Sequence, residues 1–300
     1  MTFSNDMLQT ARAAVAALRD QAPRVLQFLE TQRHPGGGFL NRAGEPDLYY
    51  TVFGIDSLLA LGAEPSGPSQ ADYLRSFGTG KTLDFVHLTC LARCWARLPD
   101  PGIGRHEKNA WRLHLEQYRS LDGGFATLIP AATTSVSAFF LALQALEDLN
   151  LLPANPLRAL SAITALRTRD GAYGNEPGLA GGTTLATAGV VCLHQRLHLP
   201  ATPALVDWLL ARCHPEGGFL ANPAAPVPDL LSTATVLYAL HRLRHPLDPA
   251  RRNACLRFIE SVMAESGGFC GHGMDDTPDC EYTFYALLAL GCLAEGSVAR

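Results

Sequence analysis

The chain has 300 residues, of which 47% are hydrophobic and 17% carry a charged side chain. This composition is too apolar for an intrinsically disordered protein and is sufficient for one large buried core. The 24 basic and 28 acidic side chains leave a net charge of −4, which argues against a nucleic-acid partner because a phosphate-binding surface needs a dense basic stripe.

The first residues show no basic segment followed by an apolar run, and no later stretch is apolar over about 18 residues. The sequence therefore predicts neither a signal peptide nor a transmembrane segment. We expect a cytoplasmic protein, with peripheral membrane association as an alternative. The eight cysteines lack the spacing of a metal or disulfide motif and mostly lie in apolar helical patterns, which favours reduced thiols in the core.

A short glycine and aromatic motif repeats along the chain. It occurs as Gly37-Gly38-Phe39, Gly123-Gly124-Phe125, Gly171-Ala172-Tyr173, Gly217-Gly218-Phe219 and Gly267-Gly268-Phe269. The last three intervals between the aromatic residues are 46 to 50 residues, and the first is 86, which is about two periods with one lost motif near Phe77-Gly78. The repeat therefore predicts six units.

A polar cluster follows each motif and begins an apolar run. The clearest examples are Pro46-Asp47, Pro228-Asp229 and Pro278-Asp279, each with a threonine four residues after the aspartate. Proline disfavours helix at the residue before it, and aspartate caps the free N–H groups of a first turn, so these positions predict helix starts. The runs that follow, such as 139–146 and 284–290, are apolar almost all round and predict buried helices.

A more amphipathic helix precedes each motif, for example 204–212 and 252–263. Each unit is then an outer helix, a glycine turn and an inner helix. Because the inner helices are apolar on every face, a closed ring buries them better than an open solenoid. We predict an all-α fold, an (α/α)6 toroid that forms a single domain over residues 1–300.

The repeated Gly-Gly-Phe followed by Pro-Asp-x-x-Tyr/Ser-Thr resembles the repeat of protein prenyltransferase β subunits and class II terpene cyclases of the squalene–hopene type. The resemblance covers about residues 20 to 294. It implies an isoprenoid-processing enzyme that holds a hydrophobic prenyl substrate in the toroid cavity. A fold does not fix a reaction, so the reaction is predicted from particular residues.

In such a ring all inner helices begin at the same end, so we expect their first turns and the glycine loops to surround one cavity mouth. The residues expected to bind substrate there are Tyr49, Tyr50, Phe53, Asp47, Asp229 and Arg42. The aromatic members would stabilise carbocations by cation–π attraction.

The prenyltransferase resemblance implies a zinc site, with ligands at the heads of the fifth and sixth inner helices. Only Asp229 matches, because Leu231 and Tyr282 stand where the family has cysteine and histidine. We expect no cofactor, and zinc or magnesium remain alternatives. The candidate metal ligands are His87, Cys270, His272 and Asp276.

The cyclase resemblance implies a proton-donating acid in Asp279-Cys280-Glu281-Tyr282. Two carboxyl groups near an apolar cavity raise one pKa by repulsion and desolvation, which suits an acid catalyst. Asp279, Glu281 and Tyr282 are therefore the predicted catalytic residues. An N-cap role alone is the competing interpretation of Asp279.

The sequence thus favours acid-initiated terpenoid cyclisation of an isoprenoid small molecule. One alternative is a zinc-dependent prenyltransferase β-like subunit for a protein or peptide, with a helical partner subunit. The other is a non-catalytic toroid that binds a lipid or a peptide.

Overall fold

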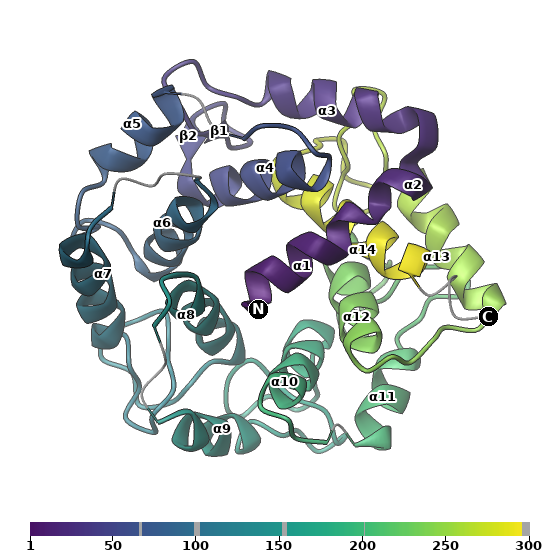
Figure 1. Ribbon diagram of the computed structural model, residues 1–300. Helices are drawn as coiled ribbons and strands as arrows, with labels where there is room; N and C mark the ends of the chain where they lie inside the picture. Colours follow the sequence, from purple (N-terminus) through teal and green to yellow (C-terminus); the bar gives the residue numbers. More distant parts are fainter. Residues whose placement is uncertain (66–67, 99–102, 152–154, 201, 296–300) are drawn as a thin grey trace.

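The fold is a closed ring of helical hairpins, seen in a computed structural model that describes residues 1–65, 68–98, 103–151, 155–200 and 202–295. Within these ranges, α3 to α14 form six hairpins with six inner helices surrounded by six outer ones (Figure 1). The inner helices are α4 (Leu48–Ala60), α6 (Phe85–Arg97), α8 (Val136–Asp148), α10 (Thr184–Arg196), α12 (Leu230–Arg242) and α14 (Cys280–Glu295). The outer helices are α3 (Ala22–Thr31), α5 (Pro68–Ser76), α7 (Arg105–Gln117), α9 (Pro156–Thr164), α11 (Pro203–Leu210) and α13 (Pro249–Ser261).

The inner helices pack side by side in chain order, and α14 returns to pack on α4, so the ring closes. Each inner helix is buried over most of its surface, as its apolar sequence predicts. The predicted all-α toroid is confirmed.

Aspartate caps begin the inner helices where the sequence placed them. The side chain of Asp229 accepts a hydrogen bond from the Ser232 amide at 2.7 Å, and that of Asp279 accepts from the Tyr282 amide at 2.9 Å. In the third and fourth units the caps are Ser135 and Thr183. These bonds satisfy first-turn N–H groups that have no partner inside the helix.

The threonine of each Pro-Asp motif joins the glycine turn to the inner helix. Thr233 accepts from the amide of Phe219 at 2.9 Å and donates to the carbonyl of Asp229 at 2.7 Å. Thr51 and Thr283 make the same pair of bonds in the first and sixth units. In the first unit this contact extends into a short antiparallel pair, β1 (Phe39–Leu40) with β2 (Pro46–Asp47). The threonine of the repeated motif therefore holds the glycine turn against the start of the inner helix by hydrogen bonds.

Neighbouring units are joined at the same end of the ring. The first amide of α12, at Leu230, donates to the carbonyl of Gly271 in the next glycine loop at 2.8 Å. Thr184 does the same toward Ala221. Between the last unit and the first, the Arg42 side chain reaches Asp279 at 2.7 Å and completes the circle.

An N-terminal helix that the repeat does not predict closes the opposite end of the ring. Helix α1 (Phe3–Arg12) begins near the centre of the ring and continues through α2 (Ala14–Leu18) and a 3-10 turn (Arg19–Gln21) into the first outer helix (Figure 1). It contacts α14, α4 and α8. The amide of Phe3 donates to Glu147 at 2.9 Å, and Asp6 pairs with Arg242 at 2.5 Å. These partners lie near the C-terminal ends of the inner helices, so α1 covers that end.

The eight cysteines of the described residues form no disulfide, as the sequence predicts, and seven of them are buried. Cys213 is the half-buried exception. In the part of the chain that the structure describes, no helix combines the length and apolar character needed to cross a bilayer.

Candidate active site

A central cavity of about 320 Å³ lies inside the inner ring and is lined by all six inner helices. The volume lies near the small end of the range typical of ligand pockets. Leu185 at its rim is 42% exposed, so the cavity opens to solvent near the starts of the inner helices. At the other end Met7 of α1 forms part of the floor.

The lining side chains form three layers, because the second, sixth and ninth residues of a helix share one face. The outermost layer holds Tyr49, Val86, Ser137, Leu185, Leu231 and Glu281. The middle layer holds Phe53, Cys90, Leu141, Gly189, Thr235 and Tyr285, and the deepest holds Arg93, Gln144, Cys192, Tyr238 and Leu288. The upper two layers are largely apolar and aromatic, whereas the floor is more polar.

Glu281 is the one carboxyl group among the lining side chains of the described cavity. It accepts a hydrogen bond from the Tyr49 hydroxyl at 2.6 Å. Burial raises the pKa of Glu281 to about 7, helped by the nearby charge of Asp279 and opposed by the Tyr49 hydrogen bond and by Arg42. Near neutral pH this side chain is therefore divided between a carboxylic acid and a carboxylate, which suits a proton donor.

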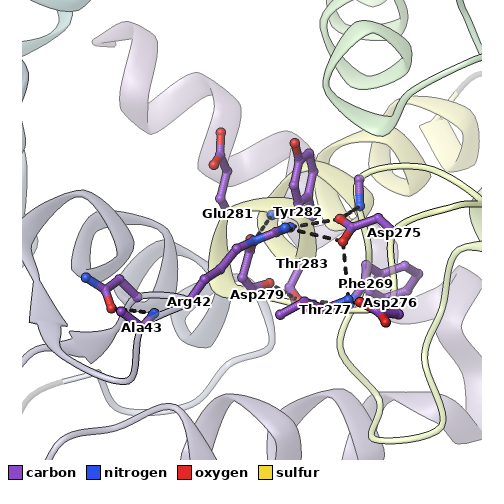
Figure 2. Close-up of polar contacts among 12 residues, drawn as sticks. Arg42, Ala43, Phe269, Asp275, Asp276, Thr277, Asp279, Glu281, Tyr282 and Thr283 are labelled. Atoms are coloured by element: carbon purple, nitrogen blue, oxygen red, sulfur yellow. Dashed lines mark hydrogen bonds and ion pairs between the residues drawn. The ribbon is translucent and has the colours of Figure 1, made fainter.

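Next to Glu281, but outside the cavity lining, Arg42 forms an ion-pair cluster (Figure 2). Its guanidinium lies 2.7 Å from Asp279 and 2.8 Å from Asp275, and over the Tyr282 ring at 5.4 Å. Burial opposes ionisation of Asp275, but hydrogen bonds from Arg42 and backbone amides lower its pKa to about 2. In Figure 2 the Glu281 side chain points away from this cluster.

Of the nine residues predicted for catalysis and substrate binding, Tyr49, Phe53 and Glu281 line the cavity. The first turns of the inner helices surround the cavity mouth, because the second residue of each one lies in the outermost layer. The remaining predicted residues, Asp47, Asp229, Asp279, Tyr50, Tyr282 and Arg42, do not belong to the lining. A cap precedes its helix and turns its carboxylate back onto first-turn amides, and this separates the three aspartates from the cavity.

The four predicted metal ligands are not brought together. His87 is held on both ring nitrogens, by Asp84 at 2.8 Å and Asp47 at 3.4 Å, and these bonds, with that to Asp47 the larger influence, raise its pKa to about 9. The His272 ring accepts from the amide of Met274, and the Asp276 carboxylate from the Thr277 hydroxyl.

The zinc positions that the prenyltransferase resemblance implies do not fit a metal either. Asp229 is committed to its cap, Leu231 lines the cavity, and the Tyr282 ring contacts Arg42. Among the described residues, no three histidine, cysteine, aspartate or glutamate side chains are placed to hold one ion.

The sequence analysis missed the polar floor, which contains Arg93, Gln144 and Tyr238. A signal for Arg93 was present, because it interrupts an otherwise apolar face of its helix nine residues after the Asp84 cap. The contribution of α1 had no such signal, since α1 lies outside the repeat.

Comparisons with known proteins agree with this architecture. A family model for the prenyltransferase alpha-alpha toroid domain matches residues 4–220 and 206–299. No curated protein sequence matches the chain significantly.

Solved structures share the fold at low sequence identity. A variant of the type II terpene cyclase MstE from Scytonema, in complex with its product merosterolic acid A, has a TM-score of 0.62 at 15% identity, covering 95% of this chain and 98% of that chain. Another MstE variant, in complex with its substrate geranylgeranyl dihydroxybenzoate, has the same TM-score and coverage at 14% identity. A glycosidase variant has a TM-score of 0.60 at 11% identity, covering 94% of this chain and 97% of that chain.

These likenesses concern the fold, which hosts more than one chemistry. Because the family model spans nearly the whole chain, the protein belongs to the prenyltransferase alpha-alpha toroid domain family.

Proposed function

We propose that this protein is an acid-initiated terpenoid cyclase that holds a prenyl chain in the central cavity and uses Glu281 as the proton donor. The observation that carries the proposal is a carboxyl group with a pKa of about 7 on the wall of a cavity that is otherwise largely apolar and aromatic. An ordinary glutamate is almost fully ionised at neutral pH and would be a poor acid there.

In the proposed step, the O–H bond of Glu281 breaks. With a double bond a new C–H bond forms at one of its carbons, and with an epoxide a new O–H bond forms at the ring oxygen while one C–O bond breaks. The neighbouring carbon becomes cationic and is attacked by the next double bond, which closes a ring. The final cation loses a proton to a base, so a polyene product is an isomer of its substrate. The Tyr49 hydroxyl, at 2.6 Å, stabilises the glutamate anion left after proton transfer.

The aromatic rings of the cavity wall suit a cationic intermediate. The ring centroids of Tyr49 and Phe53 lie 5.0 Å apart, and those of Phe53 and Tyr285 lie 5.4 Å apart. Together they form a continuous aromatic surface beside Glu281 in the upper two layers. Such faces attract a cation without offering a nucleophile that would end the reaction early.

The proposal is supported by the likeness to MstE, whose structures contain a prenylated substrate and its product. A zinc-dependent prenyltransferase is the weaker candidate, because only Asp229 matches one of its three ligands and no group of three possible ligands is found among the described residues. Zinc content and a co-purifying helical subunit are the observations that would favour it.

The test is product analysis with a panel of polyprenols, their epoxides and their diphosphates. We expect the wild type to convert at least one alcohol or epoxide to a cyclic product, and Glu281→Gln to reduce turnover by at least a hundredfold. Glu45→Gln, at an exposed glutamate of the first glycine loop, is the matched control and should keep full activity. Full activity of Glu281→Gln would refute the mechanism, and consumption of diphosphates alone, with release of diphosphate, would favour prenyl transfer.

A further inference from the structure

Arg93 is a buried cation in the floor of the cavity. Arg93 is 5% exposed, and its buried Nε atom has no hydrogen-bond partner. The nearest carboxylate is Asp56, 3.6 Å from a terminal guanidinium nitrogen, which is longer than a hydrogen bond. A buried charge without a hydrogen-bonded partner is costly, so a ligand that supplies the partner gains affinity.

Among the described residues, the neighbouring groups at this end make other contacts and form no hydrogen bond with Arg93. Asp56 lies 2.5 Å from the Nε atom of Arg97, which competes for the same carboxylate. The Tyr238 hydroxyl donates to Asp6 at 2.5 Å, and the Gln144 amide donates to the sulfur of Met7 at 3.4 Å.

One further carboxyl group lies near this end. Asp148 accepts from the Thr2 hydroxyl at 2.8 Å, and burial raises its pKa. Among the described residues it forms no ion pair with Arg93. Two arginines therefore share Asp56, and Arg93, which lines the cavity, donates no hydrogen bond within the described part of the chain.

We propose that Arg93 binds a carboxylate at one end of the prenyl ligand, so that the substrate class is a prenyl chain that ends in a carboxylic acid or bears one on its head group. That the ligand contains a prenyl chain rests on the proposed function. A single guanidinium matches a carboxylate in charge and, through two parallel N–H donors, in shape. A diphosphate would bring further negative charge into a cavity with no second lining cation among the described residues, which favours the carboxylate.

The position of Arg93 also orients the chain. Glu281 and Arg93 occupy the second and ninth residues of their helices, so they are separated by roughly 10 Å along the helix direction, seven residues at about 1.5 Å each. A ligand anchored on Arg93 extends past the aromatic middle layer and presents its far end to Glu281. The arginine is thus a binding residue, distinct from the proposed proton donor.

The experiment measures binding rather than turnover, using calorimetry on the full chain with Glu281→Gln in the background so that no probe is consumed. The probes are farnesoic acid, its methyl ester, farnesol and farnesyl diphosphate. We expect farnesoic acid to bind roughly 10- to 100-fold more tightly than farnesol or the ester, as for a hydrogen-bonded charge pair. Arg93→Met should abolish this preference while leaving the affinity for farnesol unchanged, which also shows that the variant folds.

Arg105→Met, at an exposed arginine of α7, is the matched control and should retain the preference. Equal binding of acid and alcohol by the parent protein would overturn the proposal, as would an undiminished preference in Arg93→Met. Tighter binding of the diphosphate than of the acid would overturn the carboxylate assignment. If Arg93→Met fails to fold, two other measurements decide the same question. Arg93→Gln should lose the preference for the acid over farnesol, and the parent protein should bind the acid more tightly than its methyl ester. A carboxylate preference without any cyclisation would sustain the Arg93 site and refute the proposed function instead.

Discussion

At the scale of single residues, the site separates two carboxyl groups that stand two positions apart in the chain. Asp279 is turned outward to its cap and to Arg42, whereas Glu281 lies two residues later and faces the cavity. The negative charge of Asp279 nevertheless raises the pKa of Glu281. Asp279 is therefore a positioning and electrostatic residue for the proposed acid.

Glu281→Gln should stabilise the protein increasingly as the pH rises. Because burial raises the folded-state pKa from 4.5 to about 7, the wild type has its full stability from this group below about pH 4.5 and loses it as the pH rises to 7. Above pH 7 the variant should gain on the order of 1–3 kcal/mol over the wild type, and little at pH 4. Urea unfolding at several pH values measures this difference. A difference that does not vary with pH would show that Glu281 titrates normally.

Asp279→Asn should move the pH dependence of activity to lower pH. Asparagine still caps the helix, so the fold is retained. The substitution removes a charge that raises the Glu281 pKa and leaves Arg42, which lowers it, less neutralised. We expect the alkaline limb of kcat/KM to shift down by about one pH unit. An unchanged limb with lower activity throughout would mean that Asp279 acts otherwise than through this charge.

The sequence identified Glu281 because sister units hold Tyr49 and Leu231 at the same position, where no capping rule requires a carboxylate. It could not show which way Asp279 and Arg42 turn, because the unit that supplies Arg42 lies more than two hundred residues earlier in the chain. That contact exists only once the ring has closed. Residue type and spacing therefore predict which position of a helix carries an unusual side chain. They do not predict which side chains meet where the last unit packs on the first.

At the scale of the hairpin, the glycine turn of the fifth unit leaves no room for a side chain. Gly218 has a φ of 74°, and a Cβ there would lie 2.7 Å from the Phe258 ring of the outer helix α13. The turn thus packs directly on the following unit. Gly38 and Gly268 are approached in the same way, by Tyr73 of α5 and Phe28 of α3, and this explains why glycine recurs at the second position in these units.

Gly218→Val should therefore lower the free energy of unfolding by more than backbone strain alone would. Gly44 has a φ of 80°, and no atom lies within 4 Å of the place that a Cβ would take there, so Gly44→Val measures the left-handed backbone penalty, about 1–2 kcal/mol. At Gly218 we expect a further loss of about 1–3 kcal/mol from overpacking. Thermal melting of both variants checks this. Equal losses would mean that the neighbouring helix yields without cost.

At the scale of the whole molecule, the six hairpins enclose a cavity with one open end and one covered end. The ring could be predicted from the sequence because five of the six units carry the glycine and aromatic motif at a regular interval. The cover did not, since α1 belongs to no repeat and is held by contacts with residues such as Glu147 and Arg242, far away in the chain. The depth and polarity of the site therefore depend on a segment that periodicity cannot reveal.

Phe3→Ala should weaken this cover. Phe3 is 1% exposed, and its ring centroid lies 4.9 Å from that of Phe140, which lines the cavity. We expect a loss of about 3–5 kcal/mol in the free energy of unfolding and weaker retention of an apolar ligand. Val15→Ala, at a 42% exposed position of α2, is the control and should change little. Unaltered stability of Phe3→Ala would show that α1 is a passive addition to the ring.

The central claim, protonation of a prenyl chain by the protein, is tested most directly by running the reaction in D2O and analysing the product by mass spectrometry. Exchangeable acids such as Glu281 carry deuterium in this solvent and transfer it to carbon in the first step. For a polyene substrate without an epoxide, which is protonated on carbon, the account predicts a cyclic product that is isomeric with its substrate and carries one carbon-bound deuterium, formed by the wild type and not by Glu281→Gln. A product without deuterium, or one formed with loss of diphosphate, would contradict it.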